Sequence, residues 1–364
     1  MRKSRLTRRE FLKISGAGLG AFALKPVFSL SRSPILQTDF PQSARLGRVT
    51  EEGGAFLRPR PTTQVPEIRR IPGDSVVEWL REVVGFTEWR NQRWVETPEG
   101  YIWAPFLQPV KNIPNKPVES LPDDGGSQGM WVEVTVPYVE AQLANPPGRS
   151  PRISFLVENF QPIRLYYSQV FWADGIREAD GGPEYHVKEL HGSYGDEFWA
   201  SAEAFRAITP AEMTPIRPEV EDKQILVNIA RQTLSCFEDG REVYFCRVST
   251  GDYGEGRATP VGDYLQVFMK FWSTHMSGGT TGAGYDLGGI GWVTFIATGG
   301  IAVHSTYWHN NFGERTSAGC VNVSPEDARF VFRWTNPEVP YLPGTRQLSA
   351  SDQFTGTSVR VVEV

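Results

Sequence analysis

The chain has 364 residues, 40% apolar and 22% charged, which allows about two or three globular domains and excludes collagen, coiled coil and wholesale disorder. The formal net charge is −5, but residues 1–31 hold seven Lys or Arg against one Glu, so +6 lies there and −11 on the remainder. Binding of nucleic acid needs a basic face that a body of charge −11 lacks, so we expect no nucleic-acid partner.

The first thirty residues have the order of an export signal. A basic stretch at 7–13 contains Arg8 and Arg9, and an apolar, Gly- and Ala-rich run of 11 residues follows at 14–24. This order resembles a twin-arginine signal, which implies export to the periplasm or cell wall. The run is shorter than the roughly 20 residues that span a bilayer. No clear cleavage site follows Leu24, so a membrane tether through an uncleaved signal stays open.

The exported part is predicted to be mainly β, with few helices. The 21 Phe, 12 Tyr and 11 Trp of the full chain, with turn residues at short intervals, favour short strands over a helical bundle. Changes in composition divide the chain into an export signal (1–31), a linker (32–46), a small β-barrel module (47–112), a linker (113–129), a second β-rich module (130–208), a linker (209–222) and a C-terminal domain (223–364).

The first β module contains short aromatic-rich strands, such as Trp94 and Val95 leading into residues 100–103. This layout resembles the small bacterial Src-homology-3-like barrels that accompany cell-wall enzymes. An unrelated small barrel that serves as a spacer is an equally open alternative. The sequence therefore predicts a small β module without fixing its role.

The second β module is also predicted from alternation, at residues 131–136 and 163–167. Its two histidines, His186 and His191, are five residues apart without Cys or acid at metal-ligand spacing. We therefore expect them to be surface or packing histidines.

A hairpin with its turn at 239–240 is predicted to open the C-terminal domain. A two-residue turn places Cys236 opposite Val243 and Thr233 opposite Cys246, so the two cysteines point to opposite faces. A disulfide between them would need a bulge or a change of register. Both are interpreted as small buried hydrophobes.

A glycine-rich loop at 277–291 and one strand at 293–303 are predicted to lead to His304, and Cys320 follows Gly319 sixteen residues later. A cysteine after a glycine in a tight turn exposes its sulfur and directs backbone N–H groups to one point, as an oxyanion requires. A histidine on a neighbouring strand can take the thiol proton and later return it. The spacing alone is only suggestive, because isolated Cys and His residues are more often structural.

A helix is predicted directly after this turn. Ser324 is the expected N-cap, Pro325 occupies the first helical position, and acidic residues 326–327 lie in the first turn. Ala328 and residues 331–332 supply an apolar stripe that would face the core.

Residues 225–334 resemble the L,D-transpeptidase catalytic domain (YkuD-like). The resemblance rests on His304, on Ser-Ala-Gly-Cys at 317–320 with Asn322, on Val-Ser-Thr-Gly at 248–251, and on Thr-Pro-x-Gly at 259–262. It implies that 223–364 is a β-sandwich-like catalytic domain preceded by small β modules. It also implies a cysteine acyltransferase that acts on peptidoglycan stem peptides, without a cofactor or metal.

The resemblance further implies a role for each matched residue. Cys320 would attack the carbonyl after the diamino acid of a stem tetrapeptide, release D-Ala, and pass the acyl group to an amine of a second stem. His304 would be the general base, with Ser305 orienting its ring, and a histidine nearby is expected to lower the pKa of Cys320. The remaining implied roles are oxyanion donors (Gly319, Ala318 and Tyr285) and substrate contacts (Met276, Trp308 and Asn322).

One position departs from the family pattern. Ala318 stands where the motif has a second histidine, and His309, the nearby imidazole, is predicted to be a surface loop residue. Two alternatives therefore stay open: a catalytically impaired cell-wall-binding relative, and an L,D-carboxypeptidase or protein-anchoring variant whose acceptor is water or a protein amine. No paired Cys-x-x-Cys or phosphate loop supports a metal or nucleotide site.

Overall fold

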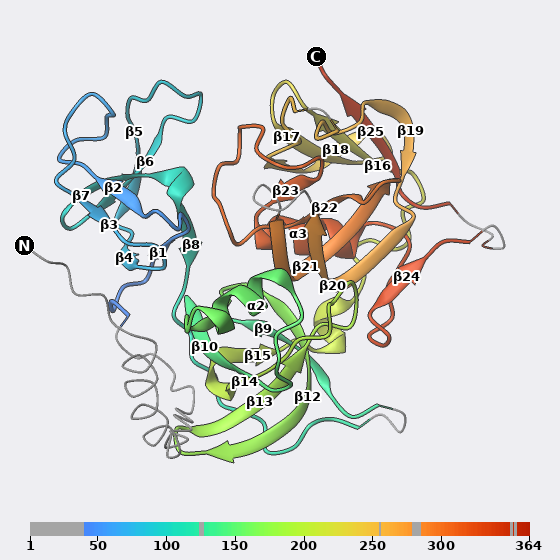
Figure 1. Ribbon diagram of the computed structural model, residues 1–364. Helices are drawn as coiled ribbons and strands as arrows, with labels where there is room; N and C mark the ends of the chain where they lie inside the picture. Colours follow the sequence, from blue (N-terminus) through green and yellow to red (C-terminus); the bar gives the residue numbers. More distant parts are fainter. Residues whose placement is uncertain (1–39, 124–126, 255, 279–284, 350–351, 353–354) are drawn as a thin grey trace, which may run out of the picture. The chain divides into compact units, whose positions relative to one another are not determined.

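The computed structural model describes residues 40–123, 127–254, 256–278, 285–349, 352 and 355–364. The chain divides into two compact units, residues 1–33 and 34–364, and the first lies wholly outside the described residues. The twin-arginine signal expected at 1–31 therefore also lies outside them. Within the described part, strands dominate and two α-helices are present, which confirms the mainly β prediction (Figure 1).

Residues 46–110, the first segment, form three small sheets with strand orders β4-β1-β8, β2-β3 and β5-β6-β7. The sheets share one core that includes Trp79, Val95 and Leu107. The expected barrel resembling Src-homology-3 modules stays a prediction. The elements are β1 (Leu46–Val49), β2 (Ala55–Leu57), β3 (Arg69–Ile71), β4 (Val76–Glu78), β5 (Arg81–Val84), β6 (Arg93–Thr97), β7 (Gly100–Trp103), η1 (Ala104–Phe106) and β8 (Leu107–Val110).

Residues 130–207, the second segment, form a seven-stranded antiparallel sheet of order β11-β10-β14-β13-β12-β9-β15. Its one α-helix, α2, was not predicted; Ser150 caps it by accepting from the N–H of Ile153. The elements are β9 (Met130–Val134), β10 (Tyr138–Leu143), α2 (Pro151–Glu158), β11 (Ile163–Tyr166), β12 (Val170–Ala179), β13 (Gly182–Lys188), β14 (Glu197–Ser201), η2 (Ala202–Ala204) and β15 (Phe205–Ala207), and η3 (Pro210–Met213) follows them.

Residues 223–362, the third segment, form two five-stranded sheets of order β18-β17-β16-β25-β19 and β23-β22-β21-β20-β24. Helix α3 packs against β21 and β22. The elements are β16 (Lys223–Asn228), β17 (Thr233–Glu238), β18 (Arg241–Arg247), β19 (Gly262–Gln266), β20 (Met269–Gly278), β21 (Tyr285–Ala297), β22 (Ile301–Ser305), β23 (Val321–Val323), α3 (Pro325–Trp334), β24 (Thr345–Gln347) and β25 (Ser358–Val362).

The predicted start of α3 is confirmed. Ser324 is the N-cap and accepts from the N–H of Asp327, and Pro325 is the first helical residue. Ala328, Val331 and Phe332 are buried, as the apolar stripe requires. This helix therefore covers the sheet that carries His304.

The predicted single strand at 293–303 is wrong. Strand β21 ends at Ala297, the chain turns through Gly299 and Gly300, and β22 begins at Ile301. Both glycines have positive φ, +79° and +84°, which L-residues with a Cβ rarely adopt. His304 therefore lies on a short return strand and not at the end of a long one.

The predicted loop at 277–291 is also wrong for the residues that the structure describes. Strand β20 continues to Gly278 and β21 begins at Tyr285, while 279–284 lie outside the described residues. Glycines at 288, 289 and 291 are strand residues. A Cβ at Gly289 would lie 2.7 Å from the ring of Phe171, so close packing by the second segment accounts for a glycine there.

The β17–β18 hairpin confirms the turn and corrects the register. Asp239 and Gly240 both have positive φ, and Glu238 pairs with Arg241. A bulge beyond this pair places Cys236 opposite Tyr244 and Leu234 opposite Cys246. The two cysteines therefore lie on one buried face, not on opposite faces, and both are free thiols.

Candidate active site

Cys320 and His304 are brought to one face of the sheet by the parallel pairing of β22 and β23. The register places Val303 beside Val321 and His304 beside Asn322. Cys320 packs with Trp308 on an apolar cluster that includes Ala302, and the rings of Trp308 and His304 are 5.9 Å apart between centroids. The structure thus places His304 in β22 and Cys320 directly before β23, the strand that pairs with it.

The turn before Cys320 requires glycine at position 319. Gly319 has φ of +120°, and a Cβ there would lie 2.7 Å from Cδ1 of Ile301. Ser317 closes the turn, because its hydroxyl accepts from the N–H of Gly319 at 3.1 Å and donates to the carbonyl of Cys320 at 2.5 Å. The motif residues therefore hold the backbone that presents the sulfur.

The motif pieces far upstream in sequence brace the same turn. The hydroxyl of Thr259 donates to the carbonyl of Gly319 and accepts from the N–H of Gly251, both at 2.8 Å. Ser249 exchanges two backbone hydrogen bonds with Asn322, each 2.9 Å long. The segments 248–251 and 259–262 thus act as supports for the cysteine turn.

The ring of His304 is held in one orientation and is neutral. Its ring is buried, and Nδ1 donates to the carbonyl of Ser305 at 2.9 Å, which leaves Nε2 as the basic nitrogen. Burial lowers the pKa of His304 to about 4. The hydroxyl of Ser305 accepts from the N–H of Gly291 at 3.1 Å, so the backbone of Ser305 orients the ring while its side chain ties β22 to β21.

The thiol of Cys320 is protonated in the resting structure. Its Sγ donates to the carbonyl of Gly300 at 3.4 Å, and burial raises the pKa of Cys320 to about 11, opposed by a hydrogen bond from the backbone of Ala302. The expected lowering of this pKa by histidine is therefore wrong. Burial also raises the pKa values of the fully enclosed thiols Cys236 and Cys246.

The three candidate oxyanion donors differ in exposure and in whether their N–H or O–H group already donates a hydrogen bond within the protein. The N–H of Gly319 already donates to Ser317, and Ala318 is exposed. Tyr285 is 41% exposed, and burial, followed by the charge that Cys320 carries as a thiolate, raises the pKa of its phenol. The phenol of Tyr285 is thus the candidate donor that no protein acceptor is shown to occupy among the described residues.

The candidate substrate residues fall into two places. Met276 and Trp308 pack against the apolar cluster that Cys320 also contacts. Asn322 is buried, and its side-chain amide lies 3.0 Å from Nε2 of His309. Nδ1 of His309 accepts from the N–H of Asn311, so the proton of the neutral ring is on Nε2. Nε2 is then a donor, and the side-chain oxygen of Asn322 is the atom of that amide that can accept from it.

The predicted surface position of His309 is wrong. The ring is half-buried, bonded to Asn322, and its pKa is lowered to about 3 by burial and by His304 nearby. His309 thus stays neutral beside the dyad. Its hydrogen bond holds the residue that pairs with His304 across β22 and β23.

Sequence reasoning missed a buried cluster of His275, Glu189 and Asp286. Nδ1 of His275 lies 2.9 Å from Glu189, Nε2 contacts Asp286, and the side chain is only 7% exposed. Desolvation opposes the charged form, but hydrogen bonds to both carboxylates raise the pKa of His275 to about 10. Local sequence gave no signal because Glu189 comes from a different segment.

The two other histidines confirm the packing interpretation. His186 contacts Asp174 and Glu197, and His191 stacks on Phe271 with centroids 4.8 Å apart. In the described part of the chain, no three His, Cys, Asp or Glu side chains form a group suited to a metal ion. Neither α2 nor α3, the α-helices among these residues, has the length and apolar content needed to cross a membrane.

Residues 222–361 match the family model of the L,D-transpeptidase catalytic domain, YkuD. The matched range contains the cysteine turn, the His304 strand and both sheets of the third segment. No curated protein matches the chain. The family match thus assigns a catalytic-domain class to the C-terminal residues.

Several solved structures are similar to parts of the chain. An L,D-transpeptidase from Mycobacterium smegmatis is 17% identical, covering 62% of this chain and 89% of that one, with a TM-score of 0.31. An Enterococcus faecium L,D-transpeptidase C442S mutant is 22% identical over 40% of this chain, with a TM-score of 0.30, and the match spans 51% of its length. An L,D-transpeptidase from Mycobacterium tuberculosis is 19% identical, covering 67% of this chain and 98% of that one, with a TM-score of 0.29.

Proposed function

We propose that the protein is an exported peptidoglycan L,D-transpeptidase with Cys320 as nucleophile and His304 as general base. The observation that supports the proposal is the parallel pairing of β22, which holds a neutral imidazole, with β23, which directly follows a partly exposed thiol. The family match over residues 222–361 supports the reaction class. Stem peptides of peptidoglycan are the substrates that this class implies, outside the cytoplasm.

The first half-reaction begins from a neutral thiol and a neutral imidazole. Nε2 of His304 takes the thiol proton as Sγ attacks the carbonyl carbon after the diamino acid of a tetrapeptide stem. The bond to the terminal D-Ala breaks, its amine receives the proton from His304, and a thioester remains on Cys320. Because the resting thiol has a pKa of about 11, proton transfer accompanies attack instead of preceding it.

The second half-reaction transfers the acyl group. The side-chain amine of a second stem attacks the thioester carbonyl, loses a proton to Nε2 of His304, and the sulfur leaves and is reprotonated. Tyr285 is proposed as an oxyanion donor. Gly319 and Ala318 can contribute N–H groups once Ser317 releases its hydrogen bond to Gly319.

The direct test incubates the purified full chain with tetrapeptide muropeptides and follows D-Ala release and dimer formation by mass. Cys320→Ala is the control, and Cys236→Ala is the matched variant of a buried thiol outside the site. We expect release and dimers with the native chain and with C236A, and neither with C320A. Identical products from the native chain and C320A would rule out the proposal.

A second candidate function is a catalytically impaired wall-binding relative. Three observations favour it: Ala318 lacks the motif imidazole, the N–H of Gly319 is engaged, and Sγ donates to Gly300. Thiol labelling of Cys320 in the native chain and in His304→Gln separates the two functions. An active dyad makes labelling slower in H304Q, whereas equal rates support the impaired relative.

The acceptor is part of the proposal as well. A thioester that is trapped without dimers, or that yields a free tripeptide, indicates transfer to water or to a protein amine. Export by the twin-arginine route is proposed from residues 7–24 alone. The matching experiment replaces Arg8 and Arg9 with lysines and measures the exported fraction.

A further inference from the structure

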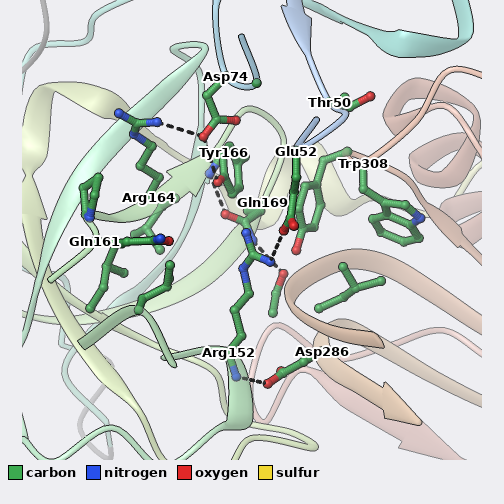
Figure 2. A pocket seen from close by; sticks show the side chains of 18 of the residues that line it. Thr50, Glu52, Asp74, Arg152, Gln161, Arg164, Tyr166, Gln169, Asp286 and Trp308 are labelled. Carbon is green, nitrogen blue, oxygen red and sulfur yellow. Dashed lines mark hydrogen bonds and ion pairs between the residues drawn. The ribbon is translucent and has the colours of Figure 1, made fainter. Parts of the chain in front are cut away.

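A cavity of about 690 Å³ lies beside the dyad and is lined by all three segments. Thr50 and Asp74 come from the first segment, Arg152 and Tyr166 from the second, and Trp308 from the third (Figure 2). Its volume is within the range of about 300–1,000 Å³ that ligand sites occupy. Neither Cys320 nor His304 lines it, so this cavity is separate from the place where the first stem meets the sulfur.

The cavity nevertheless lies next to residues that contact His304 and Cys320. Trp308 forms one wall, and its ring centroid is 5.9 Å from that of His304. Leu287, another wall residue, packs with Cys320 on the same apolar cluster. A peptide in the cavity would therefore have one end beside the base that must deprotonate an incoming amine.

Most charges in the lining are already neutralised within the protein. Asp74 lies between Arg48, at 2.7 Å, and Arg164, at 2.9 Å. Asp286 contacts His275 and accepts from the backbone N–H of Arg152 at 2.7 Å. These groups hold the walls in place and leave the guanidinium of Arg152 as the cation to consider.

Arg152 has two side-chain partners. Its guanidinium contacts Glu52 at 3.3 Å and hydrogen-bonds with Tyr166, and the Glu52 side chain is 87% exposed while that of Arg152 is 43% exposed (Figure 2). An exposed pair of this kind contributes little, so a ligand carboxylate that bonds both guanidinium nitrogens can displace it. Nε of Arg164 is also buried without a hydrogen-bond acceptor among the described residues.

We propose that this cavity binds the carboxylate-bearing end of the acceptor stem peptide through Arg152. The inference rests on the proposed function and adds a second peptide site to it. Glu52, together with exposed Glu51, repels a carboxylate and sets a modest affinity. The first and second segments then serve catalysis by forming the acceptor site.

The test is a transfer assay on the full chain, with the donor tetrapeptide fixed and an acceptor tripeptide varied. Arg152→Gln should raise the acceptor KM roughly tenfold, which corresponds to about 1.4 kcal/mol. Arg152→Lys should recover part of this loss, because it keeps the charge without the bidentate geometry. Glu52→Gln should lower the acceptor KM, since it removes the competing carboxylate.

The matched control is Arg217→Gln, which breaks an exposed Arg–Glu pair outside the cavity, with side chains 58% and 63% exposed. Opposite shifts for R152Q and E52Q, with R217Q close to the native chain, support the acceptor site. Equal acceptor KM values for R152Q and R217Q overturn it. So does an R152Q effect that falls mainly on D-Ala release.

Binding separates this inference from the proposed function. Calorimetry with C320A and the tripeptide should show an affinity that falls when the peptide carboxylate is amidated and when Arg152 is also replaced by Gln. If the native chain releases no D-Ala while this binding persists, the proposed function is wrong and the site stands. If D-Ala is released but amidation leaves the affinity unaltered, the function stands and the site is wrong.

Discussion

The first and second segments meet the third segment through interfaces that differ in how much buried aromatic surface they contain. Trp131 and Trp172 of the second segment belong to the same buried cluster as Trp272 of the third, and the rings of Trp131 and Trp272 stack with centroids 5.6 Å apart. The first segment instead donates to backbone carbonyls: Arg48 to Tyr307 and Arg93 to Asn310, both at 2.7 Å.

This difference predicts which segments unfold together and which segment opens separately. Water replaces a hydrogen bond to a carbonyl when an interface opens, so its net contribution is small, whereas buried indole surface has no such substitute. We expect the second and third segments to unfold as one cooperative unit. The first segment should open at lower free-energy cost, which would give a large acceptor peptide access to the cavity beside it.

The largest effect is expected from Trp131→Ala. It removes the stack on Trp272, the edge contact with Trp172 and the hydrogen bond from Nε1 to the carbonyl of Tyr341. The free energy of unfolding should fall by about 3–5 kcal/mol, measured by denaturant titration. Trp89→Ala, at a 54% exposed tryptophan of the first segment, is the control. Equal losses for the two variants would contradict the proposed difference between the interfaces.

Arg48→Met is the corresponding change at the polar interface. It removes hydrogen bonds to Gln108 and to the carbonyl of Tyr307, and Asp74 keeps Arg164 as a partner. We expect a loss of about 2 kcal/mol, confined to the first segment, because the core of the other two is untouched. Hydrogen exchange resolved by segment checks this. Faster exchange throughout the third segment would show that the interfaces are not independent.

The charged cluster of His275 predicts a pH dependence for the interface between the second and third segments, where His275 meets Glu189. The folded pKa of about 10 lies above the ordinary 6.5, so the stabilisation is fully present below pH 6.5 and is lost as pH rises through 10. Between pH 8.5 and 11 the free energy of unfolding should fall by about 2 kcal/mol. His275→Gln should flatten this part of the pH profile. An unchanged slope in H275Q would show that other groups cause it.

The smallest effect is expected from Asn311→Ala. Its side-chain oxygen accepts from Nδ2 of Asn91 at 3.1 Å across the polar interface. The loss should be about 1 kcal/mol or less in the free energy of unfolding. A loss in the free energy of unfolding as large as that of Arg48→Met would mean that water does not replace this hydrogen bond. The interface would then exclude water more than we expect for a polar contact.

The start of α3 could be predicted because its signal is local: Ser324 and Pro325 specify a helix start from adjacent residues. The roles of His304 and Cys320 rest on the resemblance of their motif and stay a prediction. The strand at 293–303 was misjudged because Gly299 and Gly300 turn the chain inside an otherwise apolar run.

Long-range contacts explain the other errors. A bulge between the Phe237–Glu242 and Cys236–Tyr244 pairs shifts the partner of Cys246 by one position, and alternation alone does not reveal such an insertion. The pKa of Cys320 depends on how deeply the folded sheet encloses it, and the His275 cluster needs Glu189 from another segment. Neither enclosure nor a partner distant in sequence leaves a local pattern.

The cysteine turn sets unequal mutational tolerance at neighbouring positions. At Gly319 a side chain faces both a disfavoured backbone angle and a collision with Ile301, so a saturation library should retain glycine there almost alone. Ala318 is exposed, so larger side chains should pass a folding selection at that site. A histidine at 318 is therefore sterically permitted, because packing does not require alanine at that position.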